Sequence, residues 1–381
     1  MDFSLNAEQV RLKESVSDFA ERVLGPGVVE RDEKEYYDPN TFKAMADLGL
    51  TGIPFEESWG GVGMDVVAYA IVVEEISRVD PSAGDTLLSH VSLGAYPIEM
   101  FGNDQQKQKY LISLAKGEKQ AAFALTEANA GSDVLGMSMQ AAADGNAWIL
   151  NGRKIFVTNG GVADIYIVFA RTGAKELKSK AFSAFIIEKG TPGFSFGKYE
   201  NKMGLRGTQN CDLVFEDCII SHDNMLGKIG EGYKIAMQTL AGGRIGIAAQ
   251  ATGIAQGAFE KAVEYAKTRI QFGKPIAQQQ AVAFKLADMA LKIDSARLLT
   301  YRAAWKKTNG RPYSVDAAMA KLVASETANW VTSQAVQIHG GYGYTREYPV
   351  ERMMRDAKIT EIYEGTSEIQ RVVISNSIIN D

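Results

Sequence analysis

The sequence has few of the residues that build cross-links and metal sites, with two cysteines and three histidines among 381 residues. Cys211 and Cys218 share one strand-like run, and two cysteines cannot form a disulfide framework. His90, His222 and His339 lie far apart and share no ligand spacing. We therefore expect two half-buried thiols, no metal site and no nucleophile system based on histidine.

The sequence also lacks a long apolar run and an excess of positive charge. No run reaches the ~20 apolar residues of a membrane helix, and the first residues do not combine a basic leader with an apolar core, as a secretory signal does. There are 41 lysines and arginines against 46 aspartates and glutamates. That balance argues against binding of nucleic acid through a basic patch. We expect a cytoplasmic protein with no membrane span and no nucleic-acid partner.

The familiar nucleotide-binding and hydrolase motifs are absent as well. The chain has no GxxxxGKS/T phosphate loop, no GxSxG elbow and no HExxH pair. Residues 60–63, GGVG, lack the third glycine and the strand–helix setting of a GxGxxG loop. Nucleotide binding by the common parallel α/β folds is therefore not supported.

Hydrophobic periodicity divides the chain into a helical, a β and a second helical part. Helices fit residues 7–24, 41–48, 66–76, 85–101 and 104–115 within an N-terminal domain of residues 1–118. Over 119–228, β-branched and aromatic runs alternate with turns, and Asp144-Gly145-Asn146 indicates a hairpin. The helical period returns over 229–381. We expect an α+β protein with an N-terminal helical domain, a middle antiparallel β-barrel or sandwich, and a C-terminal four-helix bundle.

A helical pattern over 281–299 carries two apolar stripes. The first comprises Val282, Leu286, Met289 and Ile293, and the second comprises Phe284, Leu291 and Leu298. A helix that is apolar on two sides is typical of a bundle interior. We therefore expect this helix to bury both stripes.

Two segments of the middle part have the composition of ligand-binding loops. In residues 123–134 a strand-like run enters a loop in which Thr126, Ser132 and backbone amides could hold a polar planar ligand or a pyrophosphate. In RKIFVTNGG, side-chain alternation places Phe156 and Thr158 on one face of a strand, where they could line a flat ring. Taken alone, an ordinary surface loop and a half-buried strand remain open interpretations.

A third segment, residues 269–280, holds a turn after a helical pattern. Arg269 could serve an anionic group there, or it could be a solvated arginine in a helix-ending loop. The sequence does not decide between these two interpretations.

A fourth segment places a carboxylate between two helices. Gly365 ends one helix, and the capping-box spacing of Ser367 and Gln370 predicts a new helix that begins at Ser367. Glu364 therefore lies at the junction, where its carboxylate can face a cavity. Beside an apolar neighbour such as Tyr363, it could have a raised pKa and act as a base. A solvated glutamate near a helix end is the alternative.

All four segments occur in this order around a helix–β–helix layout. In that combination the chain resembles the acyl-CoA dehydrogenase family over essentially its whole length, and closely the short-chain, butyryl-CoA branch. The motifs are highly specific together, although each alone would be moderate: FALTEANAGSD, IFVTNGG, RIQFGKP, QIHGGYGY, YPVERMMRDAKI and IYEGTSEIQ.

The resemblance implies an enzyme that oxidises a fatty acyl-CoA to its trans-2-enoyl-CoA, with FAD as cofactor. In this family a glutamate removes a proton from the α-carbon, and the β-carbon gives a hydride to the flavin. The α-proton is not acidic in water, so hydrogen-bond donors in a dry site must polarise the thioester oxygen. The base must also face the flavin across the acyl chain.

Carried over position by position, Glu364 is the catalytic base, and its backbone amide and a flavin hydroxyl would hold the thioester oxygen. The positions that match the family's FAD contacts are Phe123, Leu125, Thr126, Ser132, Phe156, Val157, Thr158, Arg269, Phe272, Gln280, Gln337, Gly340, Gly341, Thr366 and Glu368. Among these, Arg269, Phe272 and Gln280 match residues that reach the FAD of a neighbouring subunit. The positions that match substrate contacts are Ser132, Gly243, Arg244 and Gly365.

Three positions distinguish this chain within the family. Some relatives carry the base at the position of Gly243, and the glycine there points to a base at residue 364 instead. Ala241 replaces an aspartate that the branch often has before Gly-Gly-Arg, which leaves the CoA or acyl contacts open. Ala128 replaces the usual proline after Thr-Glu, which loosens that loop.

The resemblance also implies partners. It implies an electron-transfer flavoprotein and a homotetramer. Because one base and one flavin catalyse both directions, an enoyl-CoA reductase working with a bifurcating electron-transfer flavoprotein is the alternative. Its substrate would be an acrylyl-, crotonyl- or aryl-enoyl-CoA such as caffeyl-CoA. A non-catalytic flavoprotein scaffold is a remote alternative, against which Glu364 argues.

Overall fold

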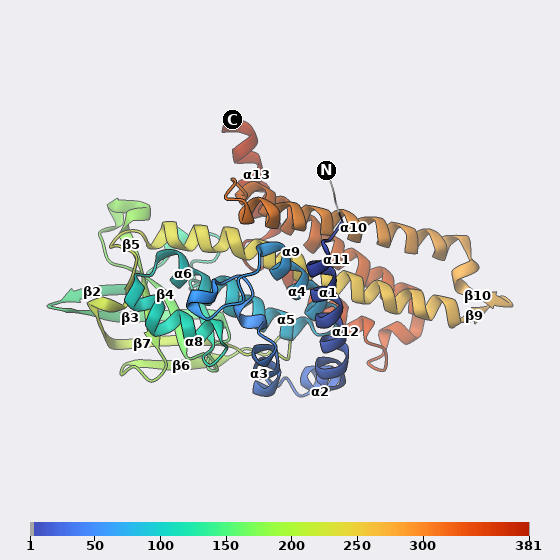
Figure 1. Ribbon diagram of the computed structural model, residues 1–381, viewed down its shortest axis with the longest axis horizontal. Helices are drawn as coiled ribbons and strands as arrows, with labels where there is room; N and C mark the ends of the chain where they lie inside the picture. The colour runs from blue at the N-terminus through green and yellow to red at the C-terminus, as the bar shows by residue number, and fades with distance from the viewer. Residues whose placement is uncertain (1–3, 381) are drawn as a thin grey trace.

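The computed structural model describes residues 4–380, so residues 1–3 and 381 of the predicted first and last domains lie outside the described residues. Figure 1 shows an elongated molecule with the β-sheet at one end, a small β9–β10 hairpin at the other, and long helices between them. None of the helices within 4–380 is long and apolar enough to cross a membrane. In the same range, no group of three or more potential metal ligands comes together.

The N-terminal part is helical, as the periodicity predicts. Its helices are α1 (Ala7–Phe19), α2 (Val28–Glu33), α3 (Pro39–Asp47), α4 (Val66–Val79), α5 (Pro81–Leu88), α6 (Tyr96–Phe101), α7 (Asp104–Gln106) and α8 (Ile112–Ala115). The helix predicted over 85–101 is interrupted by a π-helical turn, Ser89–Ala95. Asp80 caps α5, since its side chain accepts hydrogen bonds from the backbone amides of Ser82 and Ala83.

The middle part is an eight-stranded sheet, in which seven strands follow the order β6-β7-β3-β2-β4-β5-β8 and the eighth, β1, pairs with β4. Its strands are β1 (Ala121–Ala124), β2 (Gln140–Asp144), β3 (Ala147–Thr158), β4 (Ile165–Arg171), β5 (Phe182–Glu188), β6 (Phe194–Tyr199), β7 (Asn210–Ser221) and β8 (Met225–Leu226). Most neighbours are antiparallel, but β1 and β2 run parallel to β4. The predicted hairpin joins β2 to β3.

Alternation along the strands builds two hydrophobic cores. In β4, Ile165, Ile167 and Phe169 face the core shared with the helices, whereas Tyr166 and Val168 face a second core inside the sheet. Cys211 and Cys218 both lie in this second core. Both cysteines are free and fully buried there, rather than half-buried, and burial raises the pKa of the Cys211 thiol to about 12.

The C-terminal part consists of long helices. They are α9 (Gly232–Thr268), α10 (Gln280–Thr308), α11 (Ser314–His339), α12 (Val350–Lys358) and α13 (Ser367–Asn380), with β9 (Ile270–Gln271) and β10 (Lys274–Pro275) between α9 and α10. Helix α9 packs against α11, α10 and also α4 of the N-terminal part. Small residues, mostly alanine and glycine, line these buried contacts.

The two apolar stripes of α10 have different surroundings. Met289 and Ile293 of the first stripe are buried. The prediction that both stripes are buried within the chain is wrong, because Phe284 is 60% and Leu291 67% exposed. Only one side of α10 meets other helices of the same chain.

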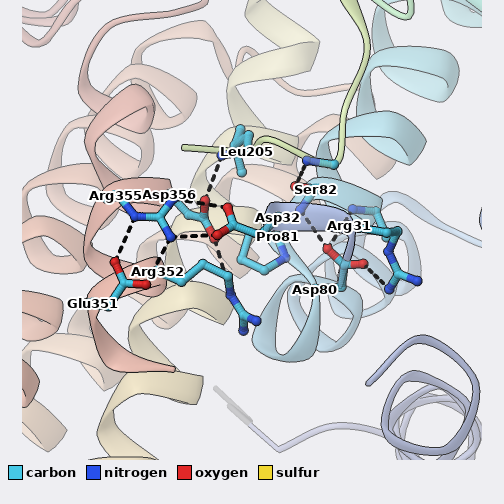
Figure 2. Close-up of polar contacts among 12 residues, drawn as sticks. Arg31, Asp32, Asp80, Pro81, Ser82, Leu205, Glu351, Arg352, Arg355 and Asp356 are labelled. Carbon is cyan, nitrogen blue, oxygen red and sulfur yellow. Dashed lines mark hydrogen bonds and ion pairs between the residues drawn. The ribbon is translucent and has the colours of Figure 1, made fainter. Parts of the chain in front are cut away.

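A network of ion pairs and hydrogen bonds joins the three parts (Figure 2). Arg355 of α12 bonds both carboxylate oxygens of Asp32 on α2, at 3.0 and 2.7 Å, and Glu351 of its own helix. Asp356 accepts a hydrogen bond from the backbone amide of Leu205, in the β6–β7 connection, at 2.6 Å. Nearby, Arg31 pairs with Asp80 at 2.7 Å at the start of α5. The network thereby fixes where α5 begins.

Candidate active site

Glu364 lies in a sharp turn between the short 3-10 turn Ile359–Glu361 and α13. Its φ angle is 50° and that of Gly365 is 96°, so two successive residues adopt left-handed conformations. The Gly365 carbonyl accepts hydrogen bonds from the Lys321 ammonium and the Gln370 amide, both at 2.8 Å. These contacts hold a strained turn in place, and strained backbone is typical of functional sites.

Helix α13 begins at Ser367 as predicted, but the predicted capping box does not form. The Thr366 hydroxyl accepts the hydrogen bond from the backbone amide of Ile369, at 3.3 Å, so the cap is one residue earlier. The side chain of Gln370 bonds the Gly365 carbonyl instead of reaching back to Ser367. The capping residues therefore stabilise the turn that carries Glu364.

The Glu364 carboxylate is buried, and neither oxygen has a hydrogen-bond partner. Burial raises the pKa of Glu364 to about 8, against the lowering effect of Arg244 on α9 and Lys321 on α11. Arg244 itself is 7% exposed, and its Nε also has no partner. The structure therefore places a buried carboxylate at the predicted junction, and burial raises its pKa. A buried group with unused hydrogen-bonding capacity is a candidate base.

Gly243 of α9 lies directly against this carboxylate. A Cβ atom at Gly243 would overlap Oε2 of Glu364, and it would lie 2.9 Å from Cδ2 of Leu93. Only a glycine leaves the carboxylate its present place. The two positions that the sequence singled out for the base, 243 and 364, are thus neighbours in space.

The predicted residues of the middle part lie at the end of strand β3 and in the loop after β1. The backbone carbonyl of Thr126 accepts a hydrogen bond from the amide of Ile155 at 2.9 Å, which places the loop after β1 beside β3. Phe156 has a φ angle of 57° at an irregularity in the β3–β7 register, and its ring is 61% exposed. Thr158 is half-buried and accepts a hydrogen bond from the Asn210 side chain at 3.0 Å.

Not every predicted residue of this group has a side chain that a ligand could contact. Val157 is 2% exposed and packs inside the sheet, so only its backbone is available to a ligand. Leu125 is buried and Phe123 is partly buried against Phe169, with ring centroids 5.0 Å apart. Ser132 is exposed in the loop.

The sequence interpretation missed a buried ion pair that holds this loop. Lys154 is fully buried, and its ammonium bonds Glu127 at 2.7 Å and the Leu125 carbonyl at 3.0 Å. Glu127 also accepts hydrogen bonds from Ser138 and Met139. The sequence gives one signal for this pair. Lys154 stands at a position of β3 where side-chain alternation predicts an inward-facing residue.

Other predicted residues lie at the far end of the long helices (Figure 1). Arg269, Phe272 and Gln280 flank the β9–β10 hairpin, whereas Gln337, Gly340 and Gly341 follow at the end of α11. Phe272 is 94% exposed. A cavity of about 490 Å³ lies here and is lined by Tyr265, Arg269, His339 and Tyr342, among others.

The predicted cofactor residues therefore form separate groups within one chain. Helix α9, with 37 residues, is about 55 Å long and separates the sheet from the hairpin. Thr366, half-buried, and Glu368, exposed, lie at the start of α13 near Glu364. No single ligand of ordinary size contacts both ends of α9.

Comparisons with known proteins agree with this architecture. Family models described as the N-terminal, middle and C-terminal domains of acyl-CoA dehydrogenase match residues 6–118, 122–218 and 230–379. A short-chain specific acyl-CoA dehydrogenase from Clostridium acetobutylicum is 53% identical over 99% of this chain and 100% of its own. An acryloyl-CoA reductase (NADH) from Anaerotignum propionicum is 48% identical, over 99% of this chain and 96% of its own.

Solved structures show the same similarity. A chain from work on the electron transferring flavoprotein of Acidaminococcus fermentans and flavin-based electron bifurcation is 52% identical, with a TM-score of 0.99 and both chains covered in full. Butyryl-CoA dehydrogenase from Megasphaera elsdenii is 51% identical, with a TM-score of 0.98 and 100% of both chains covered. An FAD complex of PigA is 33% identical, with a TM-score of 0.95 and 99% of each chain covered. The chain therefore belongs to the acyl-CoA dehydrogenase family.

Proposed function

We propose that this chain is a flavin-dependent dehydrogenase that interconverts a short-chain acyl-CoA and its trans-2-enoyl-CoA. The observation that carries the proposal is the buried Glu364 carboxylate, which has no hydrogen-bond partner and touches Gly243. The names of the relatives support the substrate class, since they include a short-chain acyl-CoA dehydrogenase and a butyryl-CoA dehydrogenase.

In this proposal Glu364 takes the proton from the α-carbon of the thioester. A buried carboxylate with a pKa of about 8 is a stronger base than a solvated glutamate, and so it takes up a weakly acidic proton more readily. The backbone amide of Glu364 would donate to the thioester oxygen and stabilise the charge that develops there. Arg244, from α9, adds a positive charge beside the same carboxylate.

The residues at the end of β3 and in the loop after β1 fit a flavin. The exposed ring of Phe156 offers a flat apolar surface, and the Thr158 hydroxyl, which accepts from Asn210, keeps its own proton for donation. Phe123, Leu125, Thr126 and Ser132 would hold the cofactor from the loop after β1, and Thr366 and Glu368 from α13. FAD, when bound, supplies the acceptor for the hydrogen that leaves the β-carbon as hydride.

We also propose that the working assembly is a homotetramer. The predicted FAD residues at the hairpin lie too far along α9 to contact the cofactor of their own chain, and would instead reach that of a neighbouring subunit. The exposed apolar stripe of α10, with Phe284 and Leu291, offers a surface for that neighbour. Sedimentation equilibrium of the purified holoprotein tests this, and a monomer at micromolar concentration would count against it.

An electron-transfer flavoprotein is the proposed redox partner. A second candidate function is the same reaction in the opposite direction. The similarity to an acryloyl-CoA reductase favours an enoyl-CoA reductase as that candidate, in which protonated Glu364 would donate the α-proton. Coupled anaerobic assays in both directions, with the electron-transfer flavoprotein as mediator, distinguish the two. A cytoplasmic location stays a prediction, which cell fractionation tests.

The central test is Glu364→Gln in the holoprotein. The variant should bind FAD and fold, because glutamine matches the volume of glutamate and removes a buried carboxylate. Loss of the base should slow bleaching of the flavin by acyl-CoA about 10³-fold, within the usual range for general acid–base catalysis. Stopped-flow absorbance under anaerobic conditions measures this rate. Undiminished bleaching would refute the assigned role, and a protein that never takes up FAD would refute the flavin-dependent function.

A further inference from the structure

Asp85 is a buried carboxylate that the catalytic scheme above does not use. It lies on α5, 2% exposed, and its Oδ1 has no hydrogen-bond partner. Burial raises the pKa of Asp85 to about 7. A helix that is buried along its whole length usually carries apolar residues at such a position, because an unsatisfied buried carboxylate costs free energy.

The packing of α5 directs this carboxylate toward the catalytic turn. The Tyr363 hydroxyl donates to the side-chain oxygen of Gln250 on α9, and the amide of Gln250 donates to the Pro81 carbonyl at 3.0 Å. Pro81 and Asp85 are four residues apart and so share one face of α5. These two hydrogen bonds place the first turn of α5 beside Gln250 and Tyr363. The charge of Asp85 also contributes to raising the pKa of Tyr363 and of Glu364.

The groups beside Asp85 leave its free oxygen unused. The Lys202 ammonium lowers the pKa of Asp85, but it donates its hydrogen bond to the Thr208 carbonyl at 2.6 Å. The Thr208 hydroxyl also lies beside Asp85 and lowers its pKa, but it donates to the Leu205 carbonyl, also at 2.6 Å. Within residues 4–380, no side chain or backbone group donates to Oδ1.

Further polar groups surround the same region. Ser89, one turn after Asp85 on the same face, is 3% exposed. The Tyr69 hydroxyl of α4 is buried without a partner, and the Glu364 charge raises the pKa of Tyr69. A plain hydrocarbon chain would leave the Tyr69 hydroxyl and Oδ1 of Asp85 unsatisfied, whereas a chain with a polar end could bond them.

From this geometry we propose that Asp85 forms the far end of the acyl site and selects a CoA thioester whose tail carries a hydroxyl group. The hydroxyl would donate a hydrogen bond to Oδ1 of Asp85 while the α-carbon lies at Glu364. The proposal rests on the function proposed above and narrows its substrate class. A site built to bond a substrate hydroxyl discriminates strongly against the analogue that lacks it, because its own polar group is then left unpaired.

The test compares matched thioesters that differ only in a tail hydroxyl. Butyryl-CoA is paired with 4-hydroxybutyryl-CoA, and 3-phenylpropionyl-CoA with 3-(4-hydroxyphenyl)propionyl-CoA. The holoprotein should prefer the hydroxylated member of at least one pair by about tenfold or more in kcat/KM, as one hydrogen bond to a charged group implies. Asp85→Leu should reverse that preference. Asp85→Asn, which keeps the shape, should reduce it about tenfold.

Two controls separate specificity from folding. Asp356→Asn changes a buried carboxylate whose partners are all within the chain, and it should leave the preference unchanged. Asp85→Leu should raise the melting temperature, because it removes an unsatisfied buried charge. A lower melting temperature would assign Asp85 a structural role beside Lys202 and count against the proposal.

The outcomes distinguish the two proposals. If no thioester of the panel bleaches the flavin, the proposed function fails. If the unsubstituted thioesters react well and the hydroxylated ones gain nothing, or if neither Asp85 variant changes the ratio, the function stands and the role of Asp85 is refuted. Dissociation constants of each pair, measured by calorimetry in Glu364→Gln, should show the same preference without turnover. Equal constants for the two members of both pairs would contradict it.

Discussion

Two clusters of buried carboxylates in this molecule have opposite surroundings. At the junction of Figure 2, Asp32 and Asp356 accept hydrogen bonds from Arg355 and from the Leu205 amide. At the candidate active site, Glu364 and Asp85 have oxygens with no partner inside the chain. Burial is common to both clusters, so burial alone does not identify a functional carboxylate. The difference teaches that a buried charge whose partners are all internal holds the parts together, whereas one with unused capacity is available to a ligand.

Removing Arg355 should have the largest effect on folding. Arg355→Ala leaves Asp32 and Glu351 without their common partner, so the free energy of unfolding should fall by about 2 kcal/mol, less than for a fully buried pair because these side chains keep some contact with water. Urea denaturation measures the change. Arg22→Ala is the control, because its pair with Asp18 is solvent-exposed and should contribute no more than about 1 kcal/mol. Equal losses in both variants would erase the proposed contrast between the clusters.

A methyl group at Gly243 should displace the Glu364 carboxylate of the candidate active site and slow the reaction. In Gly243→Ala the new Cβ would overlap Oε2 of Glu364, so the carboxylate must move although the fold is kept. A displacement of about 1 Å is expected to lower the rate of flavin bleaching on the order of 10²-fold.

The neighbouring glycine supplies the control for that substitution. A Cβ at Gly242 would meet the Lys307 ammonium at 2.7 Å, the end of a flexible side chain that can shift. Gly242→Ala should therefore leave the bleaching rate within a few-fold of the parent. Equal activity of the two variants would show that the position of Glu364 tolerates movement, and would weaken its assignment as the base.

Much of the architecture follows from local patterns. The order of helical, β and helical parts, the hairpin at Gly145 and the junction at Glu364 all depend on residues that are close in sequence. The predicted cap at Ser367 was displaced by one residue, because the Thr366 hydroxyl caps the helix in its place through the Ile369 amide. Such a choice between adjacent hydroxyls is decided by the geometry of the turn, which the sequence does not specify.

Features that depend on distant contacts could not be predicted. The second stripe of α10 has the pattern of a buried face, but Leu291 meets no other part of the described chain that covers it. The π-helical turn at Ser89–Ala95 and the left-handed φ angle of Phe156 have no clear local signal. In the sequence Asp85 looks like an ordinary exposed helix residue. Its burial follows only from the packing of α5 against distant parts of the chain. These are the positions at which tertiary packing overrides local preference.

The pH dependence of the reaction is the smallest expected effect, and it is specific to Glu364. Glu364 must be ionised to accept a proton, and its pKa is about 8 in the free protein. In the direction of acyl-CoA oxidation, kcat/KM should rise about tenfold per pH unit below that value and level off above it. In the direction of enoyl-CoA reduction, where the protonated form donates, it should instead fall above the same pH. Steady-state assays from mildly acidic to alkaline pH measure both profiles.

The same titration predicts the sign of a stability change. The folded pKa of Glu364 lies above its ordinary value of 4.5, so between these values the folded state binds more protons than the unfolded state. Its contribution to stability is therefore present at low pH and is lost as the pH rises toward 8. Asp85, with a pKa raised to about 7, contributes in the same direction. In Glu364→Gln the free energy of unfolding should fall less with rising pH than in the parent. The difference is the contribution of the Glu364 carboxylate. Identical pH profiles of unfolding in the two proteins would mean that the Glu364 carboxylate is solvated, which would remove the physical basis for its role as the base.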